Sequence, residues 1–139
     1  MAYTEEELHG IFHRTSGYCH ICHGRLALRN YGVIGARGAW EVEHSNPRAL
    51  GGTDRLNNLY AAHIPCNRRK GATSTRSARG RHGISRAPLS TAKANQIKTD
   101  NALLGAAAGA TIGAAAGPPG MLFGALIGAC MGYEIDPHT

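Results

Sequence analysis

Two short pairs of metal-binding residue types constrain the fold of this chain more than any other feature. Cys19 and Cys22 form the first pair, His63 and Cys66 form the second, and each pair leaves two residues between its members. Two such turns can supply the ligands of a tetrahedral Zn²⁺ site. Four protein ligands leave no open position for water, so the sequence predicts a structural Zn²⁺ rather than a catalytic one. Closing this site would bring the segment between the pairs close to the residues after Cys66.

The cysteine pattern favours a reducing compartment. The first pair lies too close in the sequence for a common structural disulfide, and Cys130 lies in an apolar run. Small secreted domains place cysteines at disulfide spacings, whereas paired knuckles in reduced compartments usually bind zinc. Residues 3–9 are acidic and polar, unlike the basic and apolar start of a signal peptide. We therefore expect a cytoplasmic protein, and we expect His20 and His23 to be exposed polar residues.

A strand, a loop, a second strand and a helix are predicted between the two pairs and just after them. Residues 40–44 alternate in polarity as a half-buried strand does, and residues 59–62 can pair back with them. The segment between the strands is rich in turn residues, and a helix is expected to begin around Cys66. Thr4 and Glu7 have the spacing of a capping box, so a short helix should precede this unit.

The residues of this unit resemble those of the HNH endonucleases, which belong to the ββα-metal group. The resemblance covers residues 17–71, and its motif runs through Val42-Glu43-His44, Pro47, Gly51-Gly52-Thr53-Asp54, Asn57-Asn58-Leu59 and Cys66-Asn67-Arg68-Arg69-Lys70-Gly71. It implies a metal-dependent endonuclease that hydrolyses DNA phosphodiester bonds and leaves 5′-phosphate and 3′-hydroxyl ends. The expected fold class is α+β, a small zinc-stapled domain followed by a basic linker and a glycine-rich α-helical hairpin.

The resemblance also implies a role for each motif side chain. His44 corresponds to the general base that deprotonates the attacking water, since a neutral imidazole can accept a proton near pH 7. Asn58 corresponds to the amide that ties the loop and orients the base, with Asn57 as the alternative. Asn67 stands at the third motif position and would help to bind a catalytic Mg²⁺ or Mn²⁺ ion. Glu43 stands where many relatives have Asp, and its carboxylate would be a second ligand of that ion.

The positive charge of the chain is concentrated behind this motif. Nine of the fifteen Lys and Arg lie between Arg68 and Lys98, where there is no Asp or Glu. A basic segment of this kind suits a polyanion such as DNA, although it could also be a linker that its charge keeps soluble. We expect Arg68, Arg69 and Lys70 to contact phosphate groups. The domain organisation predicted is therefore residues 1–71 for the nuclease domain, 72–100 for the basic linker and 101–139 for the tail.

The tail contains an internal repeat of period four. Residues 101–133 carry no charge, and Pro118-Pro119 separates glycines at 105, 109, 113 and 117 from glycines at 120, 124, 128 and 132. Glycines four apart line one helix face and allow a second helix to approach closely. Each arm would be about 21–24 Å long, shorter than the ~30 Å hydrocarbon core, so a hairpin is expected rather than one straight span. It is similar to the glycine-zipper segments of some membrane-active and secreted bacterial proteins.

Three functions remain open at this stage. The first is a DNA endonuclease that meets a membrane, such as an antibacterial toxin that a specialised secretion system exports and an immunity protein inhibits, or a defence nuclease. The second is a zinc module that binds nucleic acid without cleaving it, and the third is a membrane-active glycine-zipper protein. Residues 101–133 would associate with a membrane or with a second copy of the chain, or would form a soluble hairpin or a flexible tail.

Overall fold

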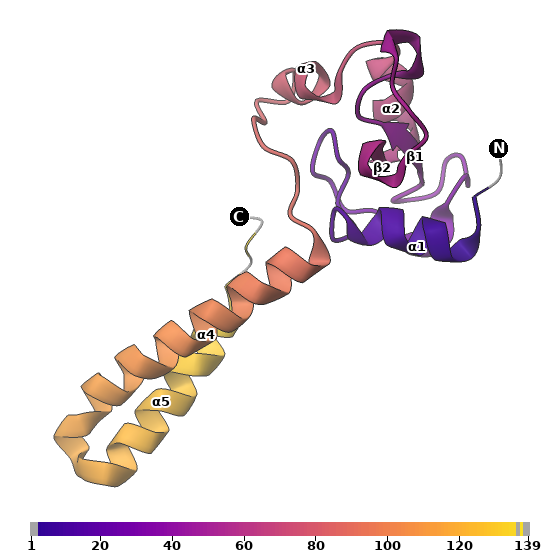
Figure 1. The fold of residues 1–139 in the computed structure, drawn as a ribbon. Helices are drawn as coiled ribbons and strands as arrows, with labels where there is room; N and C mark the ends of the chain where they lie inside the picture. Colours follow the sequence, from indigo (N-terminus) through magenta and orange to yellow (C-terminus); the bar gives the residue numbers. More distant parts are fainter. Residues whose placement is uncertain (1–2, 136, 138–139) are drawn as a thin grey trace. The chain divides into compact units, whose positions relative to one another are not determined.

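The chain divides into two compact units (Figure 1). The computed structural model describes residues 3–135 and residue 137, and the units span Met1–Thr91 and Ala92–Thr139. The first unit combines helices with a small sheet and contains the zinc-ligand cluster, whereas the second is a helical hairpin. This confirms the predicted fold class. The predicted linker, residues 72–100, contains regular structure in both units, because α3 (Thr75–Gly80) lies in the first and most of α4 (Thr91–Gly113) in the second.

The first unit is built around a two-stranded antiparallel sheet. Its elements are α1 (Glu5–His13), β1 (Trp40–His44), β2 (Leu59–His63), α2 (Ile64–Lys70) and α3, with short 3₁₀ turns at Leu28–Asn30, Arg48–Leu50 and Leu56–Asn58. In the strand register, Trp40 lies opposite His63 and His44 lies opposite Leu59. A predicted zinc ligand therefore lies at one end of the sheet, and the predicted general base lies at the other.

The helix α1 supplies one side of the core. Thr4 and Glu7 form the predicted capping box, and the helix ends at His13 rather than near Thr15. Its buried Ile11 and Phe12 belong to a cluster that also contains Trp40, Leu59 and Ala61. The Phe12 and Trp40 rings are 5.4 Å apart between centroids, and the indole N–H donates to the Leu28 carbonyl at 3.1 Å. This aromatic contact anchors α1 to the start of β1.

The second unit reverses direction through a turn of small residues. The helix α4 continues into a 3₁₀ turn at Ala114–Ala116, and α5 then spans Gly117–Glu134. Gly117 has a φ of 76°, which a residue with a side chain rarely adopts, and the two prolines that follow open α5 where their missing N–H groups cost nothing. The chain thus forms the predicted hairpin, with the reversal just before the prolines.

Glycines form the contact between the two hairpin helices. A Cβ atom added at Gly105, Gly109 or Gly113 would overlap the backbone carbonyl of the glycine opposite; the pairs are Gly105 with Gly128, Gly109 with Gly124 and Gly113 with Gly120. The helix backbones therefore touch each other directly. This is the close approach that the period-four repeat predicts, and it uses the glycine faces inside the hairpin.

Candidate functional site

The four predicted zinc ligands lie together at one end of the sheet. Their ligand atoms are all within 4.8 Å of one another, and the cluster consists of Cys19, Cys22, His63 and Cys66. The backbone N–H groups of Ile21 and His63 point at Cys19 Sγ, at 3.4 and 3.3 Å. A tight turn brings Cys22 back toward Cys19, because His23 adopts a φ of 57° and the Cys19 N–H bonds to the Gly24 carbonyl at 2.8 Å. This donor set and its compactness fit a structural Zn²⁺ ion.

A hydrogen bond on the side of the ring away from the cluster orients the imidazole of His63, as is usual for metal-bound histidines. Its Nε2 lies 3.2 Å from the Arg25 carbonyl, which can only accept, so Nε2 carries the proton and Nδ1 faces the cluster, 3.4 Å from Cys22 Sγ. Gly24 leaves room for the ring, since a Cβ atom there would lie 2.9 Å from His63 Cε1. Hydrogen bonds from Cys19 and Cys66 to its sulfur hold the pKa of Cys22 far below its ordinary value, which favours the thiolate that Zn²⁺ requires.

The predicted general base lies at the other end of the sheet. His44 ends β1, and its Nε2 lies 2.7 Å from Asp54 Oδ1. A carboxylate only accepts hydrogen bonds, so Nε2 carries the proton and the neutral ring keeps its lone pair on Nδ1. Nδ1 has no hydrogen-bond partner among the described residues. The pKa of Asp54 is lowered, first by the His44 hydrogen bond and then by Arg48, so Asp54 is a carboxylate at neutral pH.

The loop before Asp54 is tied to the second strand by Asn58. The Asn58 side chain accepts from the Asn46 N–H at 2.7 Å and donates to the carbonyls of Asn46 and Thr53 at 3.0 and 2.8 Å. Gly52 allows the loop to close, because a Cβ atom at this position would overlap the Asn46 carbonyl. The neighbouring Asn57 is exposed and bonds through its backbone carbonyl only. The loop-tying role expected of an asparagine therefore corresponds to Asn58 in this structure.

The two predicted ligands of a catalytic cation do not contact each other. The Glu43 side chain is fully buried, with Oε2 2.9 Å from His20 Nδ1 and with Oε1 accepting from Thr75 Oγ1 and lying 3.3 Å from Lys70 Nζ. Asn67 donates instead to Glu41 Oε1 at 3.0 Å. Asn67 is only partly buried and keeps its Oδ1 free of hydrogen bonds within the described chain, so it fits a cation ligand. Glu43 fits less well, because its carboxylate is fully buried and an ammonium group already lies beside it.

The three basic residues after Asn67 have different surroundings. Arg68 and Arg69 are exposed on α2, as expected of side chains that contact phosphate. Lys70 is only 3% exposed, and its ammonium group donates to the His44 carbonyl at 2.8 Å. This position does not leave Lys70 free to reach a phosphate group, contrary to the expectation from the sequence. The Lys70 side chain lies instead against the end of β1, where its ammonium group is buried.

His20 is buried, and the prediction that it is an exposed polar residue is wrong. Its ring stacks on Tyr60 with centroids 3.9 Å apart, and Arg79 Nη1 lies 2.9 Å from Nε2. Arginine only donates, so Nε2 accepts, Nδ1 carries the proton toward Glu43, and the imidazole is neutral. Burial, and to a smaller degree the Arg79 charge, lowers the pKa of His20. Burial alone would raise the pKa of Glu43, but His20, Thr75 and Lys70 outweigh it and lower that pKa.

The sequence motif contains Asp54 but indicates no role for it, and Glu41, Thr75 and Arg79 lie outside the site residues that the sequence indicates. An alternating strand does place Glu41 and Glu43 on one face, which is the signal that could have raised Glu41. Thr75 and Arg79 lie in the segment predicted to be a linker, so only the packing of α3 reveals them. The missed residues are those that act through contacts distant in the sequence.

Comparisons with known families agree with both resemblances. Residues 19–73 match the family model of the HNH endonucleases, and residues 84–139 match the model described as a YMGG-like Gly-zipper. No curated protein and no solved structure gives a significant match to the chain.

Proposed function

We propose that this chain, which joins an HNH endonuclease domain to a YMGG-like Gly-zipper, is a metal-dependent endonuclease that hydrolyses DNA with His44 as the general base. One observation carries the proposal. Asp54 holds the proton of His44 on Nε2, which leaves Nδ1 as an unbonded base at the end of β1. The family match agrees with a nucleic-acid substrate.

Each residue of the site would have a separate role in binding or cleavage. Arg68 and Arg69 on α2 would hold the phosphate backbone near the end of the sheet. His44 Nδ1 would take the proton of the attacking water, and the Asp54 carboxylate would stabilise the imidazolium that forms. Asn58 would keep the loop, and with it Asp54, in place during this step.

A Mg²⁺ or Mn²⁺ ion, when bound, would stabilise the negative charge that grows on the phosphate and on the leaving oxygen. Asn67 is the motif residue whose free amide oxygen fits such an ion. The Zn²⁺ site lies at the opposite end of the sheet and would join the segment around Cys19 to the start of α2. Its four ligands suit a structural ion, so zinc would support the catalytic end without taking part in cleavage.

Plasmid cleavage tests this function directly. The purified chain is incubated with supercoiled DNA and Mg²⁺ or Mn²⁺, with EDTA as one control and His44→Ala as the other. We expect nicked or linear products that need the cation, and a loss of about 10²–10⁴ in rate in His44→Ala. Zinc content and circular dichroism should be unchanged in that variant. A zinc-loaded wild type that binds DNA without cleaving it would favour the non-catalytic zinc module instead, and parallel reactions with RNA would define the substrate.

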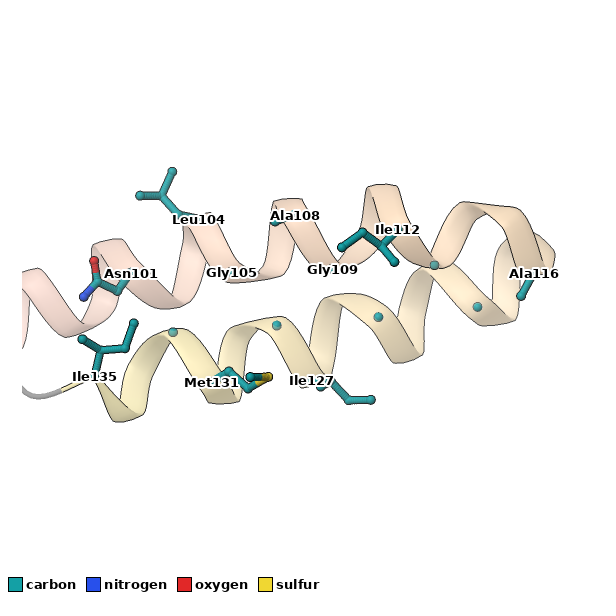
Figure 2. A pocket seen from close by; sticks show the side chains of 15 residues that line it. Asn101, Leu104, Gly105, Ala108, Gly109, Ile112, Ala116, Ile127, Met131 and Ile135 are labelled. Atoms are coloured by element: carbon teal, nitrogen blue, oxygen red, sulfur yellow. The ribbon is translucent and has the colours of Figure 1, made fainter.

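A second proposal concerns the hairpin, which we infer associates with a lipid bilayer. Its outer surface is apolar, and the large side chains that remain mostly exposed on it are Leu103, Leu104, Ile112, Leu122, Phe123, Leu126, Ile127 and Met131. Figure 2 shows Leu104 and Ile127 pointing outward from the two helices. Within Thr91–Glu134, an 18-residue stretch has a mean hydropathy of 1.4, so by length and composition the segment is apolar enough to cross a membrane. Water is a poor solvent for such a surface.

The charges flanking the apolar surface lie at one end of the hairpin only. Lys98 and Asp100 precede the uncharged residues 101–133, and Glu134 follows them. Lys98 Nζ lies 5.5 Å from the centre of the Tyr133 ring, and aromatic and lysine side chains of this kind suit the membrane interface. The hairpin would therefore enter tip first, with both of its ends on the same side. The glycine faces are already paired inside the hairpin, which argues against their use between copies.

Flotation of the full chain with liposomes tests the hairpin proposal. We expect the protein to float with the vesicles, and a variant with Leu122→Asp and Phe123→Asp to stay at the bottom while its DNA cleavage is unchanged. Leakage of a trapped dye caused by residues 101–139 would favour a membrane-perturbing function. A monomer that ignores vesicles would contradict the proposal and leave a soluble hairpin.

The combination of a nuclease and a membrane-associated hairpin suits an antibacterial effector, or toxin, that a specialised secretion system delivers into another cell. This proposal rests on the two family matches together, and a defence nuclease is the alternative. Expression of the chain in a bacterial cytoplasm should arrest growth, and His44→Ala should relieve the arrest. A protein that binds the chain and restores growth of the wild type would be the predicted immunity partner.

A further inference from the structure

We propose that Glu43 is a positioning residue for His44 and that Glu41, together with Asn67, binds the catalytic cation. The inference rests on the proposed nuclease function and departs from the resemblance, which places the carboxylate ligand directly before the histidine. It assigns new roles to Glu41 and to the buried residues around Glu43.

Glu43 has no access to solvent, and both of its carboxylate oxygens already have partners. Its side chain is fully buried, His20 occupies one oxygen, and Thr75 and Lys70 occupy the other. Magnesium-type ions keep several water ligands and also contact substrate phosphate groups, so their protein ligands must face solvent. A cation at Glu43 would have to displace the ammonium group of Lys70 and would have no route to a DNA phosphate.

The partners of Glu43 hold the backbone that directly follows the His44 side chain. Lys70 Nζ, beside the carboxylate, donates to the His44 carbonyl at 2.8 Å. Thr75 donates its hydroxyl to Glu43, and its backbone N–H donates to the Ser45 carbonyl at 3.1 Å. Two consecutive carbonyls at the end of β1 are therefore fixed by groups that Glu43 itself holds. The carboxylate thus sets the direction in which the His44 side chain leaves the strand.

The ionised Glu43 carboxylate is the counter-charge of the buried ammonium group of Lys70. Arg79 donates to the neutral ring of His20, His20 donates to Glu43, and Lys70 lies on the other side of the carboxylate. Removal of the carboxylate would leave the ammonium group of Lys70 buried without its counter-charge, which is strongly destabilising. Through Arg79 and Thr75, the cluster also makes α3 part of the nuclease unit.

Glu41 lies two residues before Glu43 on the same face of β1 but in different surroundings. It is partly exposed, and Oε1 accepts from Asn67 Nδ2 at 3.0 Å. A carboxylate cannot donate, so this bond fixes the Asn67 amide with Nδ2 toward Glu41 and leaves Oδ1 available. Glu41 Oε2 has no hydrogen-bond partner within the described chain. One carboxylate oxygen and one amide oxygen, on two partly exposed side chains that contact each other, are ligand types that Mg²⁺ and Mn²⁺ prefer.

Two glutamine variants of the zinc-loaded full chain separate the roles. The readouts are the dissociation constant of Mn²⁺ without DNA, followed by electron paramagnetic resonance, the thermal unfolding midpoint, and the cleavage rate at saturating Mn²⁺. Glu41→Gln should weaken Mn²⁺ binding at least about tenfold and leave the midpoint unchanged. Glu43→Gln should leave the Mn²⁺ dissociation constant unchanged, lower the midpoint, and slow cleavage by about 10²-fold, the cost of a misplaced base.

Glu43→Asp keeps the test decisive if the glutamine variant fails to fold. A direct cation ligand would tolerate aspartate, since relatives of this family carry it there, so Mn²⁺ binding and cleavage would be retained. A positioning carboxylate would not, because the shorter side chain cannot reach His20 and Thr75 together, and cleavage at saturating Mn²⁺ should fall. Weaker Mn²⁺ binding in either Glu43 variant, or unchanged binding in Glu41→Gln, would overturn the inference. The binding and unfolding readouts decide this even if the wild type does not cleave DNA.

Discussion

The proposed nuclease unit, residues 3–91, is ordered by a few directional contacts, whereas the hairpin is ordered by the lack of side chains where its helices touch. In the first unit, particular atoms are held in place by two kinds of contact. One is the Cys/His cluster that includes Cys19 and His63, and the other is the set of hydrogen bonds of Asn58 and Glu43. In the second, glycines allow backbone contact and leave the large apolar side chains on the outside. The first arrangement can hold a reactive group at a defined position, and the second can present a uniform surface. A change that unfolds one unit should therefore leave the other unit folded.

Loss of the zinc site should have the largest effect, and it should be confined to the nuclease unit. Structural Zn²⁺ sites contribute apparent binding free energies of about 10–16 kcal/mol, more than the usual stability of a small domain. We expect Cys66→Ser or a strong chelator to abolish cleavage and to expose the first unit to trypsin. The helical signal of the hairpin should persist in circular dichroism. Zinc loss that left residues 3–91 protected from trypsin would contradict this assignment.

A side chain at the glycine contact should damage the hairpin alone. Gly109→Leu would push a side chain into the Gly124 backbone, and overpacking of this kind costs about 1–3 kcal/mol. We expect the melting temperature of the helical signal to fall and the cleavage rate to stay constant. The matched control is Ala107→Leu, at an exposed position on the same helix, which should have little effect. Equal effects of the two substitutions would show that the glycine contact does not stabilise the hairpin.

The stability of the nuclease unit should fall as the solution becomes acidic. The pKa of Glu43 is lowered in the folded protein, so its contribution is present above its ordinary value of 4.5 and is lost as pH falls through the lowered one. The pKa of His20 is also lowered, so the unfolded chain takes up a proton below about 6.5 before the folded chain does. Both shifts therefore lower the free energy of unfolding as the pH falls.

Urea unfolding of the zinc-loaded chain between pH 7.5 and 5 checks this expectation. One proton taken up only by the unfolded chain lowers the free energy of unfolding by up to about 1.4 kcal/mol per pH unit. A His20→Gln variant should lose this slope, and a zinc indicator in the same samples separates it from release of the metal. An identical slope in the variant would assign the acid sensitivity to other groups.

The smallest effect is expected for the two exposed arginines of α2. Arg68→Ala and Arg69→Ala should each weaken binding to any DNA sequence and reduce the slope of log affinity against log salt by about one. Arg29→Ala is a matched control, because that arginine is exposed in the first unit outside the proposed site. Titrations of a labelled duplex at several salt concentrations measure the slope. Equal slopes for all three variants would show that α2 does not contact the DNA.

Local patterns in the sequence predicted most of the elements, with ends that differ by about two residues. The capping box at Thr4, the strand at residues 40–44 and the glycine repeat all depend on neighbours within a few residues, and the structure contains each of them. The burial of His20 and Lys70 could not be predicted in this way. Polar side chains of these types are usually exposed, and they are buried here because Glu43 meets both, as the hydrogen-bond acceptor of His20 and as the counter-charge of Lys70.

The sequence by itself predicted the Cys/His cluster, the order of strands and helices and the hairpin, because spacing along the chain is sufficient for each of these features. The tertiary structure alone decided which of two glutamates two residues apart is buried and which one faces Asn67. It did so because α2 lies along β1 and runs in the same direction. Asn67 therefore meets Glu41 and Lys70 meets Glu43, while Thr75 of α3 covers Glu43. Burial and partners, rather than residue type, separate a positioning carboxylate from one that can bind a cation.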